Sequence, residues 1–191
     1  MPSQSGSCSR KAMLARGGLK VSPKEKIKSS HLLRAIQGYM ANQKETISTI
    51  NDLIETLKDG QKGFKEAANA VNDPQLKSLF TGYSQQRARF SSELQAQARS
   101  EGEAEPETGG SAAGAMHRGW INLKSAITSQ DESAILAECE RGEDSAVQEF
   151  GKAMSNELPS PVRDIVSRQF SEIKSAHDRI KTLRDGAKKA A

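Results

Sequence analysis

The feature that most limits the fold is a largely apolar stripe within residues 44–71, spaced alternately by three and four positions. Its members are Ile47, Ile50, Ile54, Leu57, Gln61, Phe64, Ala68 and Val71. This spacing places them all on one side of an α-helix that packs lengthwise against helices of similar length. The stripe therefore predicts a bundle of long helices, and a hydrophobic content of only 35% suits the thin core of such a bundle.

Three further stretches, 74–99, 131–156 and 161–185, predict long helices of the same kind. Asp73 can cap the helix that begins at Pro74, because proline suits the first helical position. Shifting the chain by 87 residues lays Pro74 on Pro161, so the two pairs of helices resemble one hairpin used twice. A shorter helix is predicted from Ser111 to about Ile127, with Trp120 covering the bundle as packing mass.

The lengths of the connections predict the topology. The link at 72–73 is so short that the helices it joins must be antiparallel neighbours. By contrast, about 30 residues separate the second long helix from the third, which is enough to travel the full length of a bundle. We therefore expect an all-α, ferritin-like four-helix bundle over 44–186, with two antiparallel hairpins and a long crossover that carries a short helix.

Residues 1–43 form a basic, low-complexity extension. Residues 1–44 contain nine Lys or Arg and a single Glu, whereas residues 45–191 carry a net charge of −4. We expect this extension to be disordered or partly helical. Three alternatives remain open: an organelle transit peptide, translation starting at Met40, or a basic amphipathic helix within 1–39 that contacts nucleic acid or anionic lipid.

The composition also bears on location. Two cysteines, Cys8 and Cys139, are too few for a disulfide framework and favour a reducing cytoplasm. No apolar run approaches the roughly 20 residues that a transmembrane helix needs. We expect Cys139 to pack as a small hydrophobe, because it has no activating neighbour in the sequence.

Several segments resemble a known family, namely NDLIETLKDGQKGFKEAA, DPQLKSLF, QQRARFSSEL, HRGWINLKSAI, ECERGEDSAV and EIKSAHDRIKTLRD. They are similar to a bacterial family of uncharacterised four-helix-bundle proteins with a ferritin-like domain of unknown function. The resemblance covers about 44–186 and includes every predicted helix. It implies the fold, a bacterial origin and a loose association with stress responses, but no established activity.

The residues of a ferritin-like di-iron site are incomplete in this sequence. Such a site needs a Glu from each of two helices and a Glu-x-x-His motif from each of the other two. The first motif would fall at Arg87 and Phe90, neither of which binds iron, and the second at Lys174 and His177. We therefore hypothesise a degenerate metal site, an interior polar cluster in which a cation replaces the metal. Its members would be Arg87, Glu140, Glu143 and His177.

Two alternatives concern the same residues. In one, Glu55, Glu140, Glu143 and His177 bind one iron or manganese ion, and the protein is a metal-binding oxidoreductase or storage protein. In the other, the helix 131–156 is rotated so that Cys139 and Ala146 face inward while both glutamates face solvent. The sequence favours a non-catalytic binding or structural module without a cofactor, with homodimerisation as its expected self-association.

Overall fold

The computed structural model describes residues 23–106, 120, 122–129 and 131–190. These residues are helical apart from short turns and contain no β-strand, so the all-α prediction is confirmed. The chain divides into two units, Met1–Tyr39 and Met40–Ala191, and the helix bundle belongs to the second. All statements on structure below refer to the described residues.

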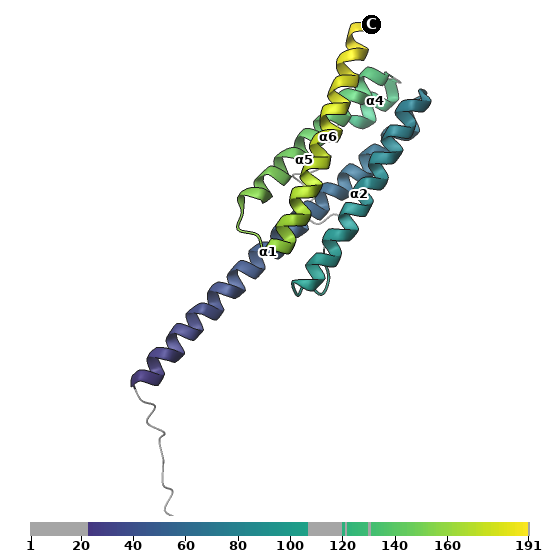
Figure 1. Ribbon diagram of the computed structural model, residues 1–191. Helices are drawn as coiled ribbons and strands as arrows, with labels where there is room; N and C mark the ends of the chain where they lie inside the picture. Colours follow the sequence, from purple (N-terminus) through teal and green to yellow (C-terminus); the bar gives the residue numbers. More distant parts are fainter. Residues whose placement is uncertain (1–22, 107–119, 121, 130, 191) are drawn as a thin grey trace, which may run out of the picture. The chain divides into compact units, whose positions relative to one another are not determined.

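The helices are longer at two places than the sequence predicted (Figure 1). Their bounds are α1 Pro23–Ala70, α2 Pro74–Ser100, α4 Leu123–Ser129, α5 Glu132–Ser155 and α6 Ser160–Ala190. The first begins at Pro23 rather than at 44, because proline suits a helix start and residues 24–43 are mostly good helix formers. The last continues through Gly186, since the following Ala and Lys residues favour the helix. Most of the predicted helix 111–127 lies outside the described residues.

α1 and α2 form a tight helical hairpin. The Asp73 side chain accepts hydrogen bonds from the backbone N–H groups of Gln75 at 2.6 Å and Leu76 at 3.3 Å, and Pro74 opens the helix. The predicted cap is therefore present, and it satisfies N–H groups that have no partner within the helix. Further along, the Ser84 hydroxyl donates to the carbonyl oxygen of Gln61 at 2.8 Å, which joins the two helices side by side.

Hydrogen bonds at both ends of this hairpin place the end of α2 and the start of α5. At one end, the Gln43 side chain donates to the carbonyl oxygen of Glu101, just after α2 ends. At the other end, the Glu132 carboxylate accepts from the backbone N–H groups of Asn72 and Asp73, in the turn between α1 and α2. Glu101 and Glu132 therefore lie at opposite ends of the α1–α2 hairpin.

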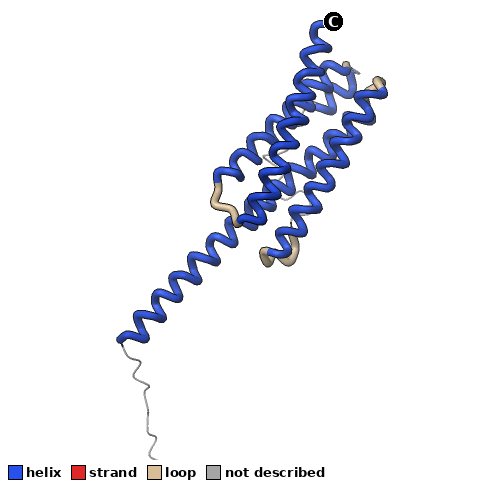
Figure 2. The backbone as a smooth tube through the Cα atoms, in the orientation of Figure 1, coloured by secondary structure: helices blue, strands red, loops and turns tan. Residues whose placement is uncertain are grey.

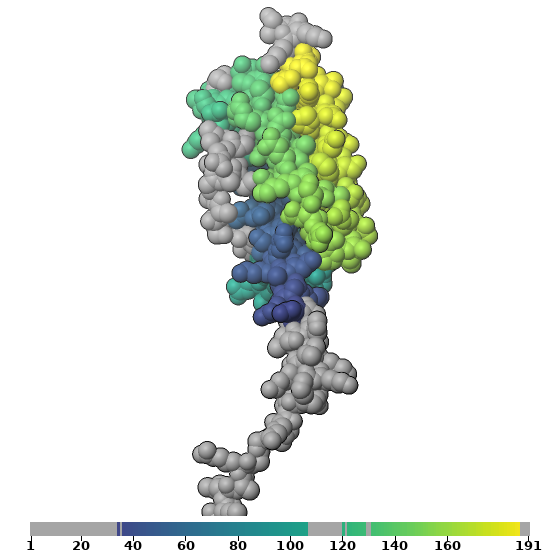
Figure 3. Space-filling model, turned by 90° about the vertical axis from the view of Figure 1, so that its left-hand side faces the viewer, coloured from purple at the N-terminus to yellow at the C-terminus, as the bar shows by residue number. Residues whose placement is uncertain are grey.

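The second hairpin, α5 and α6, packs against both helices of the first. α5 and α6 lie side by side (Figures 2 and 3). α6 also contacts α2. Between α2 and α6, Gln86 donates to Glu172 at 2.9 Å. Between α1 and α5, the Asn156 side chain that follows α5 donates to the Thr49 hydroxyl at 3.1 Å. Each long helix thus has a neighbour from its own hairpin and one from the other.

The core consists of two apolar clusters stacked along the bundle. The first contains Ile50, Leu53, Ile54, Leu57, Phe90, Leu94, Ala98, Ala146, Phe150, Ala153, Leu158, Val162, Val166 and Ile173. The second contains Phe64, Ala67, Ala68, Val71, Leu76, Phe80, Leu123, Ala126, Ile135, Leu136, Cys139 and Ile180. Most of the stripe predicted on residues 44–71 is buried in these clusters, since helical periodicity selects the residues that face the core.

Candidate functional site

A guanidinium and a carboxylate meet inside the bundle, between the two apolar clusters. Arg87 of α2 and Glu143 of α5 are each only 1% exposed, and Arg87 Nη2 donates to Glu143 Oε2 at 2.6 Å. Phe90, after Arg87, belongs to the first cluster, whereas Phe80, before it, belongs to the second. The ion pair therefore interrupts an otherwise apolar core near its middle.

Packing from two helices holds the Arg87 side chain in place. Gly60 of α1 lies beside its aliphatic part, where a Cβ would make an ordinary van der Waals contact with Arg87 Cγ at 3.5 Å. The guanidinium carbon lies 5.8 Å from the ring centroid of Phe64 and 6.0 Å from that of Phe90, within the range of a cation–π interaction. Nη1 donates to Gln86 Oε1 at 2.5 Å, while Nε has no hydrogen-bond partner.

Burial dominates the electrostatics of the site. Burial raises the pKa of Glu143, and the charge and hydrogen bond of Arg87 limit that rise. The nearby Cys139 thiol is fully buried, and burial raises its pKa well above the ordinary value. A thiol held in its protonated form is a poor nucleophile, which agrees with the packing role predicted for it.

The other two predicted cluster residues bond side chains outside this ion pair. Glu140 forms an ion pair with Arg184 of α6. The imidazole of His177 lies between two carboxylates, with Nε2 2.9 Å from Asp144 Oδ1 and Nδ1 3.0 Å from Asp178 Oδ1. The structure therefore brings Arg87 and Glu143 together, and it gives Glu140 and His177 partners of their own.

The orientation of α5 combines parts of the two orientations considered from the sequence. Cys139 and Ala146 are buried at 0% and 5% exposure, as the rotated helix would require. However, Glu143 is also buried, and Glu140 is only 7% exposed beneath Arg184. Neither glutamate faces open solvent, so the inward side of α5 is wider than a single stripe.

The side chains present do not fit a di-iron centre. Glu55 is a buried residue of α1, but the described residues include no group of three or more His, Cys, Asp or Glu side chains that could hold a metal ion. Glu143, the most deeply buried of the predicted ligands, is bonded to a fixed positive charge. A guanidinium at that distance repels a metal cation and competes for the same carboxylate.

Sequence reasoning missed the place of Trp120. A Cβ added to Gly63 of α1 would lie 2.4 Å from the Trp120 ring, and one added to Gly142 of α5 would lie 2.3 Å from it. The ring therefore occupies a slot between two helices that only a pair of glycines leaves open, and it meets Phe64 edge-on at a centroid distance of 5.2 Å. A glycine inside a long helix often allows a neighbouring backbone to approach, but the neighbour of Gly63 is this indole. A glycine within each of two long helices is the signal that could have located the slot.

Glu138 of α5 was also missed. It is 5% exposed and paired through Oε1 with Arg141, while its Oε2 is buried without a hydrogen-bond partner. No feature of the heptad pattern distinguishes it from the exposed acids of α5.

The His177 contacts predict a pH-dependent contribution to stability. Partial burial lowers the pKa of His177, but hydrogen bonds with Asp178 and Asp144 outweigh it, so the pKa is raised overall. Since the folded pKa lies above the unfolded one, this stabilisation is complete below about pH 6.5 and is lost as the pH rises through the folded value. We expect wild type to melt at a higher temperature than His177→Gln below about pH 6.5, and the difference to shrink as the pH rises through the raised pKa of His177. Thermal denaturation of both proteins at several pH values measures this difference in melting temperature. A difference that does not change with pH would contradict the prediction.

Some predictions fall outside the described residues. Cys8 and residues 1–22 lie outside them, so the contacts proposed for the basic extension stay predictions. No helix in the described residues is both long enough and apolar enough to cross a membrane.

Comparison with known proteins adds one family. The sequence model of a family described as "Domain of unknown function (DUF2383)" matches residues 45–156, which include the second half of α1 and all of α2, α4 and α5. Both Arg87 and Glu143 lie in the matched region. A search of the curated proteins found no match.

Proposed function

The chain belongs to the DUF2383 family, and on that premise we propose that it is a non-catalytic binding or structural protein whose bundle interior holds an ion pair in place of a metal. One observation carries this proposal: Arg87 and Glu143, both 1% exposed, are joined at 2.6 Å in the middle of the core. Removing two charges from water is unfavourable by several kcal/mol per ion, so such a pair persists only where the surroundings hold it closely.

The proposal includes the ferritin-like arrangement. The hydrogen bonds of Gln43 and Glu132 support it, since they put the end of α2 and the start of α5 at opposite ends of the α1–α2 hairpin, as a long crossover requires. In a ferritin-like bundle, the position of Arg87 would carry the Glu of a Glu-x-x-His motif, and Phe90 would replace its histidine. We therefore interpret the ion pair as what remains of a di-iron site after the cation of a side chain replaced the metal.

Catalysis finds little support in the described residues. Cys139 has no exposed surface and a raised pKa. His177, although it can titrate near neutral pH, is tied by both ring nitrogens to aspartates. Following the resemblance, the proposal also includes a bacterial origin, a cytoplasmic location and a role connected with stress responses.

Metal content tests the proposal directly. We expect untagged protein, incubated with Fe(II) or Mn(II) and then desalted, to retain far less than one ion per chain by elemental analysis. The reason is that the Arg87 guanidinium occupies the site and neutralises Glu143. Arg87→Glu, which restores the carboxylate of the motif, is the matched variant and should retain more metal than wild type.

The metal-free interior would be overturned if the wild-type protein retained a metal ion in stoichiometric amount and the double variant Glu143→Ala, His177→Ala lost it. That result would favour the alternative of a metal-binding oxidoreductase or storage protein.

A further inference from the structure

The side chain of Gln86 connects the interior ion pair with the surface of the bundle. Gln86 precedes Arg87 on α2 and is partly buried, and its Oε1 accepts the hydrogen bond from Arg87 Nη1 at 2.5 Å. Its Nε2 donates to Glu172 Oε2 of α6 at 2.9 Å. An amide carries its acceptor and its donors on one planar group, so a cation at the oxygen and a carboxylate at the nitrogen together fix its orientation.

Further contacts between α2 and α6 continue from Glu172. Arg168 lies one turn before Glu172 on α6, with Nη1 3.6 Å from Glu172 Oε1, and its Nη2 bonds Glu93 of α2. Gln169 Nε2 donates to Glu93 Oε2 at 2.9 Å and to the carbonyl oxygen of Phe90 at 3.3 Å. One chain of polar contacts therefore runs from the interior ion pair to the exposed side chain of Arg168.

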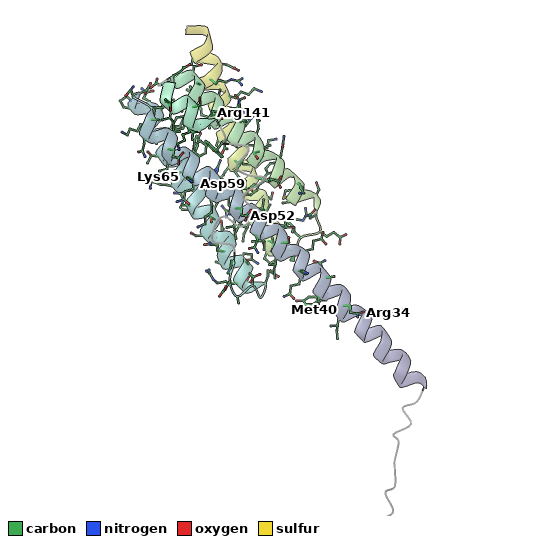
Figure 4. The ribbon with its side chains drawn as sticks, turned by 180° about the vertical axis from the view of Figure 1, so that it is seen from behind. Arg34, Met40, Asp52, Asp59, Lys65 and Arg141 are labelled. Atoms are coloured by element: carbon green, nitrogen blue, oxygen red, sulfur yellow. The ribbon has the colours of Figure 1, made fainter. Side chains whose placement is uncertain are left out.

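This chain of contacts crosses from one hairpin to the other, which distinguishes it from other charged groups on the surface. Arg141 of α5, labelled in Figure 4, is exposed, and its ionic partner Glu138 lies three residues earlier on the same helix. Lys152 likewise lies 3.9 Å from Glu149 of its own helix. Gln86, by contrast, is held by a residue of α6, so the position of its amide depends on how the two hairpins pack together.

The other contacts of the Arg87 guanidinium hold its direction less strictly. Nη2 bonds Glu143, but Nε has no hydrogen-bond partner among the described residues. The rings of Phe64 and Phe90 attract a positive charge without fixing the direction of its N–H groups. The hydrogen bond to Gln86 therefore adds a second directional contact, which keeps Nη2 turned towards Glu143.

We propose that Gln86 is the positioning residue of the interior ion pair, and that Glu172 of α6 holds Gln86 in place from the surface. The inference rests on the ion pair of the proposed function and adds how that pair is controlled. The guanidinium neutralises Glu143 fully only while α2 and α6 keep Gln86 aligned. A change at Glu172, whose side chain is 43% exposed, therefore reaches a carboxylate in the middle of the core.

The pKa of Glu143 in the full chain tests the role of Gln86. Carbon-13 NMR of labelled glutamate carboxyl groups measures it, and Glu143→Gln identifies the signal. Gln86→Met keeps an unbranched side chain of similar length but removes both hydrogen bonds. Burial raises the pKa of Glu143 and Arg87 limits that rise, so we expect this variant to raise it further, by about one unit or more. Gln85→Met, at an exposed position next to it on α2, is the matched control and should leave the pKa unchanged.

The readout is specific because the charges around Glu143 stay in place. The charged side chains that act on its pKa are Arg87 of α2, His177 of α6 and Asp144 of α5, and Gln86→Met keeps all three. Chemical denaturation gives a second readout. In the background Arg87→Met, Glu143→Leu, the effect of Gln86→Met on the free energy of unfolding should shrink by about half or more, because the group that it positions is absent.

Exchanging the two side chains tests the contact with Glu172. Gln86→Glu alone sets two carboxylates against each other and removes the donor, so it should destabilise the protein. Adding Glu172→Gln supplies a donor from α6, while the carboxylate at position 86 still accepts from Arg87. The double variant should therefore recover most of the stability that Gln86→Glu loses. Glu172→Gln by itself should have a small effect, since its amide oxygen still accepts from Gln86.

Three results would each overturn the inference: an unchanged pKa of Glu143 in Gln86→Met, an equal effect of Gln86→Met with and without the interior pair, or no recovery in Gln86→Glu, Glu172→Gln. If the wild-type protein retains no metal, these results overturn the role of Gln86 alone and leave the metal-free interior standing. One metal ion retained per wild-type chain, together with the expected changes in the Gln86 variants, would overturn the metal-free interior and support the positioning role.

Discussion

Replacing Gly142 with alanine is expected to destabilise the bundle by about 2–3 kcal/mol, an effect typical of an overpacked core. The added Cβ would lie 2.3 Å from Trp120 Cε2 and 2.4 Å from Cζ2, closer than non-bonded atoms approach. Either α1 and α5 move apart or the indole leaves its slot. At about 2–4 °C per kcal/mol for a chain of this size, the melting temperature should fall by several degrees. Trp120 is the one tryptophan of the chain, so a red shift of its fluorescence would report its exit.

Gly63→Ala should act in the same way from α1, where its Cβ would lie 2.4 Å from the other side of the same ring system. The matched control is Gly82→Ala in α2, where nothing lies within 4 Å and alanine should stabilise the helix by roughly 0.5–1 kcal/mol. In a Trp120→Ala background, Gly142→Ala should no longer destabilise the protein, since the clashing ring is gone. Unchanged stability and fluorescence in Gly142→Ala would show that Trp120 does not occupy the slot.

Replacing Arg87 with methionine should destabilise the protein by about 3–5 kcal/mol at neutral pH, because it leaves the Glu143 carboxylate buried without its cation. Glu143 can escape part of this penalty by taking up a proton, since burial already raises its pKa. In Arg87→Met the pKa of Glu143 in the folded protein rises further, because the cation that limited the rise is gone. Protonated Glu143 then contributes stability at low pH, and this contribution is lost as the pH rises through the folded pKa. The loss in Arg87→Met should therefore be smaller near about pH 5 than near about pH 8. Chemical denaturation of wild type and variant at both pH values measures this loss in the free energy of unfolding.

The reverse variant should behave differently. Glu143→Gln leaves the buried Arg87 guanidinium without its carboxylate partner, and the amide cannot relieve this by taking up a proton, so the destabilisation should persist at acidic pH. The double variant Arg87→Met, Glu143→Leu should regain most of the lost stability, since an apolar pair of similar volume often replaces a buried ion pair without loss. Arg168→Met, which breaks the exposed pair with Glu93, is the surface control and should change stability by less than about 1 kcal/mol. Equal losses for Arg87→Met and Arg168→Met would contradict the importance of the interior pair.

Much of the fold could be predicted because helical periodicity is a local property. The spacing of Ile50, Ile54, Leu57 and Phe64 identifies the buried side of α1 without knowledge of its neighbours, and all four are 0% exposed. Local chemistry also identifies the cap at Asp73 and the start of α2 at Pro74. The burial of Arg87 follows from its place on an apolar stripe, whatever partner it finds.

The partners of the site residues could not be predicted in the same way. Glu140 and Glu143 are three residues apart on α5, so they point in directions about 60° apart on the helix. This difference sends one to Arg87 on α2 and the other to Arg184 on α6. A single sequence does not give the rotation of α5 about its axis closely enough to choose between these partners.

Within this protein, the sequence alone determined where the four long helices of the bundle lie, which side of α1 is buried within the bundle and where a positive charge enters the core. Each of these depends on residues within a few turns of one another. Only the tertiary structure decided that Glu143 neutralises that charge, that His177 pairs with aspartates, and that Trp120 fills the slot between Gly63 and Gly142. Those contacts join residues far apart in the chain, and they depend on how the helices are rotated and offset when they pack together.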